Sequence, residues 1–240
     1  MSKTGVNVEG LSFAYPQQEP VFQNVSFSLK PGDRIALLGP TGTGKTTLLE
    51  HLVGLKIPQT GQIWIENILL QPANLPQIRT KVGFAFQDPA DQLFMPTLLE
   101  DITFGPRNYG ITSMEAKAKA SKLLAEFGLE KYAHRPANQL SGGQKRLAAL
   151  AAVLALKPSI LILDEPTAGL DPLWRRHLAK ILPQLPVEIL LIASHDLHWV
   201  SKVTQRALVL AKGNIQADKE IQALLKDGAT LESYGLPLDY

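Results

Sequence analysis

Gly39-Pro40-Thr41-Gly42-Thr43-Gly44-Lys45-Thr46 is the stretch of sequence that decides the fold. Its spacing, G-x-x-x-x-G-K-[ST], is typical of a phosphate-binding loop between a buried strand and a helix, here predicted at 35–38 and 45–55. Glycines let backbone N–H groups turn inward around an anion without a Cβ clash, and the helix adds its positive dipole end. The pattern predicts a nucleoside triphosphate site; a glycine-rich turn with an exposed lysine is the plainer alternative.

Three residues at the end of this loop are expected to contact the nucleotide or its metal ion. Lys45 would bridge the β- and γ-phosphates. The hydroxyl of Thr46 would bind Mg²⁺, a hard cation that prefers oxygen. Thr47 belongs to the expected nucleotide-contacting set as well. The predicted cofactors are therefore ATP and Mg²⁺.

Two carboxylates follow an apolar run further along the chain, Ile160-Leu161-Ile162-Leu163-Asp164-Glu165. In a parallel sheet, ligands bind beyond the carboxyl ends of the strands. We therefore expect Asp164 to hold Mg²⁺ through water, and Glu165 to orient and activate the attacking water in hydrolysis. The alternative is that both carboxylates only cap the next segment.

Leu140-Ser141-Gly142-Gly143-Gln144 separates this chain from other proteins with a phosphate-binding loop. Two adjacent glycines after a serine, at the start of a helix predicted at 142–156, make a second anion-binding helix terminus. A chance match to these five residues is on the order of one in several thousand at background composition. The three motifs, in this order, resemble the ATP-binding cassette (ABC) ATPases over nearly the whole chain.

The resemblance implies an assembly as well as a fold. In ABC ATPases the pentapeptide faces the γ-phosphate bound by another subunit, so Ser141 and Gly143 are expected to contact a partner's ATP. The implied assembly is a head-to-tail dimer, with a second copy or with a homologous ATPase subunit, and with two nucleotides at its interface. The implied catalytic residues are Lys45, Glu165 and His195.

Four further positions match the family pattern. Tyr15 lies where an aromatic ring stacks on adenine, and Gln87 resembles the glutamine that ligates Mg²⁺ and senses a transmembrane partner. Asp171 ends the segment 168–171, which resembles the loop that links the two active sites. His195 resembles the histidine that contacts the γ-phosphate. From the residues alone, Tyr15 could instead be a packing aromatic, Gln87 a polar loop residue and His195 a structural histidine.

The segment 86–107 narrows the resemblance. It looks like the ATPases of energy-coupling-factor importers, including the cobalt and nickel transport group, which take up vitamins or metal ions through separate membrane subunits. The loop after Gln87 and the helices beyond it would then receive a coupling helix of the membrane protein. Leu93, Phe94 and Met95 are candidate exposed docking contacts, or else they pack within the helical part.

Composition limits the remaining classes of function. The formal net charge is +2 and no Lys/Arg cluster with interleaved aromatics is present, so nothing favours a nucleic-acid partner. The absence of cysteine excludes disulfides and thiolate metal sites. Residues 1–7 carry no apolar signal segment, and the longest apolar stretch, 147–156, is too short to span a bilayer. If the chain works at a membrane, another chain must do the spanning. The resemblance implies integral membrane subunits as partners, with this chain at the cytoplasmic face of the membrane.

The predicted elements indicate the α/β class. Alternating apolar residues between 6 and 29 predict antiparallel strands. Apolar runs at 160–163, 189–193 and 207–210 predict a parallel sheet that is buried on both faces.

Helical patterns fill the middle of the chain. They include a capping box at 112–115 and predict an inserted α-helical subdomain over 89–157. The expected fold is one nucleotide-binding domain over 1–240. Its P-loop (RecA-like) core with a mostly parallel sheet, together with an N-terminal antiparallel β subdomain, would comprise 1–88 and 158–240.

The sequence thus predicts the ATP-hydrolysing subunit of an energy-coupling-factor importer for a metal ion, such as cobalt or nickel, or for a vitamin. A soluble ABC ATPase acting on nucleic acid or ribosomes is the alternative, and it predicts a basic patch, a coiled-coil insertion or tandem cassettes. A P-loop kinase would leave the motif at 140–144 unexplained. No motif indicates the solute or the role of residues 227–240.

Overall fold

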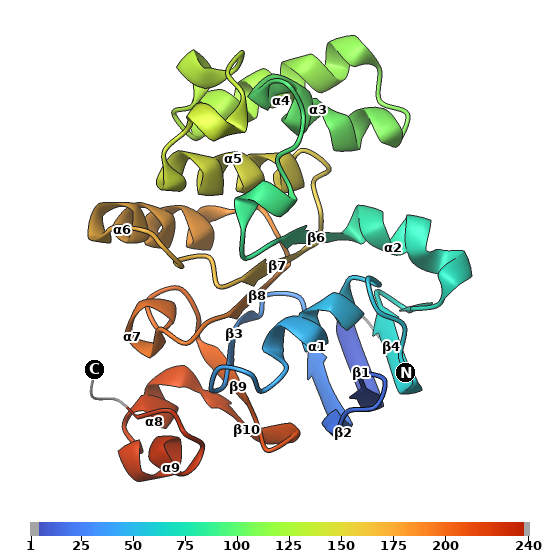
Figure 1. Cartoon of the computed structure of the whole chain (residues 1–240), viewed down its shortest axis with the longest axis vertical. Coiled ribbons are helices and arrows are strands. Elements are labelled where there is room, and N and C mark those ends of the chain that lie inside the picture. The colour runs from blue at the N-terminus through green and yellow to red at the C-terminus, as the bar shows by residue number, and fades with distance from the viewer. Residues whose placement is uncertain (1–4, 238–240) are drawn as a thin grey trace.

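The computed structural model describes residues 5–237, and two β-sheets organise this part of the chain (Figure 1). Within these residues, the larger sheet has six strands in the order β10-β9-β3-β8-β7-β6, and the smaller has four in the order β2-β1-β4-β5. Strands β9, β3, β8, β7 and β6 run parallel, whereas β10 is antiparallel to β9. The smaller sheet is antiparallel. This confirms the predicted α/β class with one mostly parallel and one antiparallel sheet.

The strands lie as follows along the chain. They are β1 Val6–Ala14, β2 Pro20–Leu29, β3 Arg34–Leu38, β4 Thr60–Ile65, β5 Ile68–Leu69, β6 Val82–Ala85, β7 Ile160–Asp164, β8 Ile189–Ala193, β9 Arg206–Ala211 and β10 Asn214–Glu220. The expectations for residues 1–4 and 238–240 lie outside the described residues.

Helices cover both sides of the larger sheet, and those of the middle of the chain stack above it (Figure 1). The α-helices are α1 Lys45–Leu52, α2 Leu75–Lys81, α3 Leu98–Asn108, α4 Ser113–Glu126, α5 Gly142–Leu154, α6 Pro172–Ile181, α7 Leu197–Val200, α8 Ile221–Leu225 and α9 Gly228–Ser233. Short 3₁₀ turns are η1 Pro72–Asn74, η2 Pro89–Asp91, η3 Glu130–Tyr132, η4 Ala137–Gln139 and η5 Leu182–Gln184.

The larger sheet separates two apolar cores, because successive residues of a strand point to opposite faces. In β7, Leu161 packs in the core that holds α3, α4 and α5, while Ile162 packs in the core with α1 and the smaller sheet. Both side chains are fully buried. A strand buried on both faces reads as a continuous apolar run, which is why β7, β8 and β9 could be recognised from the sequence.

Some predicted boundaries need correction. The helix predicted at 45–55 ends at Leu52, and the one predicted at 142–156 ends at Leu154. The predicted capping box at Thr112 is present, with both of its hydrogen bonds to Glu115. These differences fall at helix ends, where the last turn has few intrahelical partners.

One predicted docking residue is placed differently. Leu93 is 7 % exposed and belongs to the core around Leu98 and Ile102, so of the two alternatives it follows the packing one. Phe94 is 62 % exposed, as the docking interpretation requires, and Met95 is half-buried.

The close packing of β6 against α5 leads to a stability prediction. A Cβ on Gly83 would lie 2.3 Å from Cγ1 of Val153 and 2.8 Å from Cγ of Pro158. We expect Gly83→Ala to lower the free energy of unfolding by about 1–3 kcal/mol through overpacking. Gly142→Ala is the matched control, since no heavy atom lies within 4 Å of its added Cβ. Chemical denaturation measures both; an equal effect of the two substitutions would contradict the packing argument.

Candidate active site

The glycine loop, residues 39–46, connects β3 to α1 at the carboxyl end of the larger sheet. Gly44 caps α1 in the left-handed region at φ 93°, and an added Cβ would lie 2.3 Å from Cγ1 of Val21. An added Cβ on Gly39 would lie 2.3 Å from the carbonyl oxygen of Leu210. Both positions therefore require glycine, and the loop turns tightly into the amino end of α1, where free N–H groups favour an anion.

Lys45 folds back over this loop. Its Nζ donates hydrogen bonds to the carbonyl oxygens of Gly39, at 2.7 Å, and Pro40, at 3.0 Å. Lys45 is 8 % exposed, and burial lowers the pKa of its ammonium, while the charges of Glu165 and Asp164 act to raise it. The site thus places the Lys45 ammonium beside two acids. An anionic ligand could replace the two carbonyl oxygens as the acceptor of its hydrogen bonds.

Asp164, the last residue of β7, meets the start of α1. Its Oδ2 accepts a hydrogen bond from Oγ1 of Thr46 at 2.7 Å, and Asp164 is 2 % exposed. Its buried Oδ1 has no hydrogen-bond partner among residues 5–237. Burial raises the pKa of this carboxyl; Glu165 adds to the rise and the bond from Thr46 opposes it. One hydroxyl oxygen beside an unpartnered carboxylate oxygen fits a hard cation such as Mg²⁺, which keeps waters and phosphate oxygens as its other ligands.

Glu165 and His195 meet where β7 and β8 end. Oε2 of Glu165 lies 2.9 Å from Nδ1 of His195 and accepts a longer bond, 3.4 Å, from the backbone N–H of His195. Glu165 has φ 43°, and its own N–H donates to the carbonyl oxygen of Ala193 at 2.9 Å. A non-glycine residue in the left-handed region is strained, and such strain gathers at functional sites. The turn directs a nearly buried carboxylate toward an exposed imidazole.

Tyr15 contacts the first turn of α1 through Thr47. Its hydroxyl lies 3.0 Å from Oγ1 of Thr47, and the Thr47 carbonyl lies 2.7 Å from Nδ1 of His51. Tyr15 also packs edge-on against Phe13, with ring centroids 5.0 Å apart. The ring is half-buried, so it is a packing residue and still presents surface to a ligand. His51 is fully buried.

The motif at 140–144 starts α5. Ser141 is the N-cap, and Ser141 and Gln144 form a capping box that exchanges side-chain and backbone hydrogen bonds. Nε2 of Gln144 also donates to the Tyr132 hydroxyl at 2.8 Å. Ser141 is exposed, and no hydrogen bond within residues 5–237 joins it to the glycine loop. The motif is thus built as a helix terminus facing solvent, apart from the loop in the same chain.

Asp171 caps the neighbouring helix α6. Its Oδ1 accepts a hydrogen bond from the backbone N–H of Trp174 at 2.9 Å. The Trp174 ring lies against Gly143, where an added Cβ would come within 2.2 Å of it. Asp171 and the pentapeptide therefore both contact Trp174, Asp171 at the tryptophan's backbone N–H and Gly143 at its ring.

Arg146, which the sequence analysis missed, joins the loops around this terminus. Its guanidinium donates to the carbonyl oxygens of Phe86, Gln87 and Ala168 at 3.1, 2.6 and 3.2 Å. Burial lowers the pKa of this guanidinium, while the charges of Asp88 and Asp164 act to raise it. The Gln87 side chain is exposed and makes no hydrogen bond within the described residues. The sequence offered one signal for Arg146, which is that a charged residue directly precedes an apolar run of the same helix.

A glycine loop that opens a helix, two carboxylates at the end of a parallel strand in the same sheet and a second, exposed helix terminus define a nucleotide-binding ATPase. The comparisons with known proteins agree: the family model described as ABC transporter matches residues 22–168. The chain belongs to this family. It is an ATP-binding cassette of the ATPase subunits of ABC transporters.

Two relatives match nearly the whole chain. A putative ABC transporter ATP-binding protein of Streptomyces avermitilis is 42% identical over 240 residues, which cover 100% of this chain and 91% of the relative. The energy-coupling factor transporter ATP-binding protein EcfA of Methanothermobacter thermautotrophicus is 37% identical over 237 residues, covering 97% of this chain and 76% of the relative.

Two solved structures are similar as well. The first is cbiO1 of Clostridium perfringens, described as part of the ABC transporter complex cbiONQ. It has a TM-score of 0.84 and 29% identity, with 97% of this chain and 95% of that chain covered. The second is the ATP-binding cassette MJ0796, as a dimer in a post-hydrolysis state bound to ADP and Pi. It has a TM-score of 0.81 and 28% identity, with 90% and 98% covered.

The buried Asp164 leads to a prediction about pH. Because its pKa is higher in the folded than in the unfolded chain, its favourable contribution to stability is present at acid pH. That contribution is lost as the pH rises through the raised pKa. We expect Asp164→Asn to raise the free energy of unfolding of the nucleotide-free protein by about 1 kcal/mol at pH 7, since the amide oxygen can still accept from Thr46.

Thermal unfolding between pH 4 and pH 7 measures this effect. The gain should be smallest at the acid end, and the variant should lose metal-dependent nucleotide binding. Glu188→Gln is the control, as Glu188 is an exposed carboxylate elsewhere on the chain. A stability gain that is equal at both ends of the pH range would contradict the role of the ionised carboxylate.

Proposed function

We propose that this chain is the ATP-hydrolysing subunit of an energy-coupling-factor importer that takes up a metal ion, such as cobalt or nickel, or a vitamin. The carrying observation is similarity over nearly the whole chain to a protein named as an energy-coupling factor ATPase. The structural likeness to cbiO1, described as part of a transporter complex, supports the same assignment. The reaction is ATP + water → ADP + phosphate.

The geometry supports distinct roles for the residues around the phosphates. Lys45 would exchange the carbonyl oxygens of Gly39 and Pro40 for β- and γ-phosphate oxygens, as its ammonium is already aimed along the loop. Backbone N–H groups of residues 39–46, with the side chains of Thr46 and Thr47, would complete the phosphate cradle. Tyr15 would stack on adenine. Base stacking on an aromatic ring contributes about 1–3 kcal/mol.

Thr46 and Asp164 would hold Mg²⁺, with Gln87 turning inward as a further ligand. When bound, the ion neutralises charge that develops on the phosphates. Glu165 would accept a proton from the attacking water and orient it. His195, already 2.9 Å from Glu165, would contact the γ-phosphate from its exposed position. These roles require the Glu165 carboxylate to be ionised.

A second subunit would complete the site. Ser141 and Gly143 belong to a solvent-facing helix terminus that the chain's own glycine loop does not contact by hydrogen bonds within residues 5–237. A terminus with free N–H groups favours an anion, and the γ-phosphate of a partner's ATP supplies one. Asp171 would lie at the same interface. The dimeric cassette bound to ADP and Pi among the similar structures supports a dimeric assembly.

The membrane partner would contact the helical part at the cytoplasmic face. No helix within residues 5–237 is long and apolar enough to cross a bilayer. Phe94 and Phe104, 62 % and 41 % exposed, form an edge-to-face pair with ring centroids 5.0 Å apart. An exposed aromatic pair is typical of a protein-binding surface. Integral membrane transport subunits are therefore the proposed partners.

The intersubunit role of Ser141 can be separated from nucleotide binding. Ser141→Arg should reduce ATP hydrolysis at least about a hundredfold, because an arginine would fill the space of the partner's γ-phosphate. Nucleotide binding to the monomer should change by less than about twofold. Equal loss of binding and hydrolysis in Ser141→Arg would count against the dimeric site.

Glu165→Gln should keep ATP binding, stop turnover and accumulate an ATP-bound dimer in size-exclusion chromatography.

Co-purification tests the importer assignment. The chain, expressed with the integral membrane subunits encoded beside it, should purify with them from detergent-solubilised membranes. Phe94→Ala with Phe104→Ala should weaken this association by more than about tenfold, whereas Met114→Ala, an 80 % exposed control on α4, should not. Stable association with ribosomes or nucleic acid, and not with membrane subunits, would favour the soluble ABC ATPase.

A further inference from the structure

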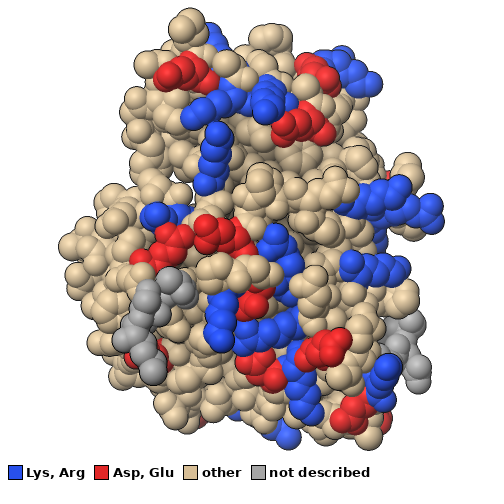
Figure 2. Space-filling model, turned by 180° about the vertical axis from the view of Figure 1, so that it is seen from behind, with Lys and Arg blue, Asp and Glu red and all other residues tan. Residues whose placement is uncertain are grey.

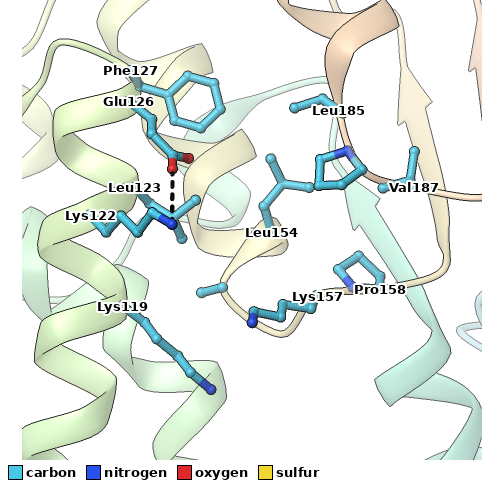
Figure 3. Close-up of a pocket in the computed structure, with 12 residues that line it drawn as sticks. Lys119, Lys122, Leu123, Glu126, Phe127, Leu154, Lys157, Pro158, Leu185 and Val187 are labelled. Atoms are coloured by element: carbon cyan, nitrogen blue, oxygen red, sulfur yellow. Dashed lines mark ion pairs between the residues drawn. The ribbon is translucent and has the colours of Figure 1, made fainter.

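A cavity lies at one end of the larger sheet, and the nucleotide site lies at the other end. Its volume is about 440 Å³, and it is open between α4, the end of α5 and the segment before β8 (Figure 3). Pro158 and Val187, which line it, precede β7 and β8, whereas Asp164 ends β7 and His195 follows β8. Because β7 and β8 are parallel, the cavity and the carboxylates lie at opposite ends of the same strands.

The cavity has apolar walls. Phe127, Leu154 and Val187 line it and are 7 %, 8 % and 6 % exposed. The volume lies within the range of about 300–1,000 Å³ typical of small-molecule sites. These walls would shield the apolar part of a ligand of that size from water on several sides.

The rim of the cavity is basic. Lys119 and Lys157 line it, and neither forms an ion pair within the described residues, while Lys122 pairs with Glu126 at 3.8 Å. The ammonium groups of Lys119 and Lys157 extend toward the open space between α4 and the loop after α5 (Figure 3). From behind, Lys and Arg side chains lie across the helical part of the molecule, with Asp and Glu side chains among them (Figure 2). At the rim, the charges of Lys119 and Lys157 are not compensated by an ion pair within the described residues.

We propose that this cavity binds a small amphipathic anion, a molecule with an apolar body and one carboxylate, sulfonate or phosphate group. The apolar body would fill the space between Phe127, Leu154 and Val187. The anionic group would lie at the rim between Lys119 and Lys157. Such a ligand would contact both the helical part and the larger sheet, and so would brace one against the other.

The site is separate from the nucleotide. Helix α5 has 13 residues, so Ser141 at its start lies about 20 Å from the cavity at its end. Strand β7 spans five residues, about 17 Å, between the cavity and Glu165. The two ligands can therefore be bound at once, and the proposal does not depend on the importer assignment.

Fluorescence of 8-anilinonaphthalene-1-sulfonate tests the site on the purified full chain, because this probe joins an aromatic body to a sulfonate. We expect saturable binding of about one probe per chain, retained with saturating ATP. The double variant Lys119→Gln/Lys157→Asn should weaken binding at least about fivefold, an amount suited to two partly exposed charges. Asparagine tolerates the left-handed backbone of Lys157, at φ 54°.

Two further variants give the controls. Lys117→Gln/Lys226→Gln removes the same charge from exposed lysines that do not line the cavity, and it should leave probe affinity unchanged. Leu185→Trp adds bulk to a half-buried residue of the lining and should abolish binding while the protein stays folded by circular dichroism. Equal affinity in all variants, or displacement of the probe by ATP, would overturn the proposal.

The charge requirement has its own test in a pair of competitors. Decanoate should displace the probe at least about fivefold more effectively than 1-decanol, which has a chain of equal length and no charge. Decanoate should also raise the unfolding temperature of the wild type more than that of Lys119→Gln/Lys157→Asn, because a ligand that binds only the folded state stabilises it. Equal displacement by the acid and the alcohol would contradict an anion site.

Discussion

The hydrogen bond from the Thr46 hydroxyl to the buried Asp164 carboxylate joins the two halves of the nucleotide site across 118 positions of sequence. It can form only because β3 and β7 flank β8 in one parallel sheet, so that the glycine loop and the carboxylates leave at the same edge. The bond satisfies Oδ2 and leaves Oδ1 buried without a partner. A buried unpaired carboxylate oxygen destabilises the nucleotide-free chain, and a bound cation would remove that cost.

Arg146 extends this arrangement from the phosphates to the second helix terminus. A buried guanidinium is costly unless its donors are satisfied. Here Nη1 and Nη2 donate to three carbonyl oxygens, while the buried Nε has no hydrogen-bond partner within the described residues. Two of these carbonyls belong to the segment that ends in Gln87, and the third belongs to Ala168, close to Asp171. A shift of α5 would therefore move both loops. Lysine could not replace this geometry, because its single ammonium lacks the planar fork of donors.

The sequence predicted those features that depend on local spacing. The glycine loop, the carboxylates after β7 and the capped start of α4 are set by residues a few positions apart, and their local structure is as expected. The sequence left docking and packing open for Leu93, because Leu93 shares a polar loop with Phe94 and only the packing of Leu98 and Ile102 decides which side chain turns inward. The role of Arg146 was not predicted for the same reason. Its hydrogen-bond acceptors are backbone carbonyl groups that the fold brings together, and backbone groups leave no pattern of residue types in the sequence.

The two adjacent glycines of the pentapeptide have different physical causes. No heavy atom lies within 4 Å of a Cβ added to Gly142, so its missing side chain leaves open surface at the amino end of α5. A Cβ added to Gly143 would collide with the Trp174 ring. Gly142 thus suits a ligand that approaches from outside, whereas Gly143 is fixed by α6, whose cap is Asp171. The second glycine therefore ties the orientation of the terminus to the loop at Asp171, so that both would present to a partner subunit as one surface.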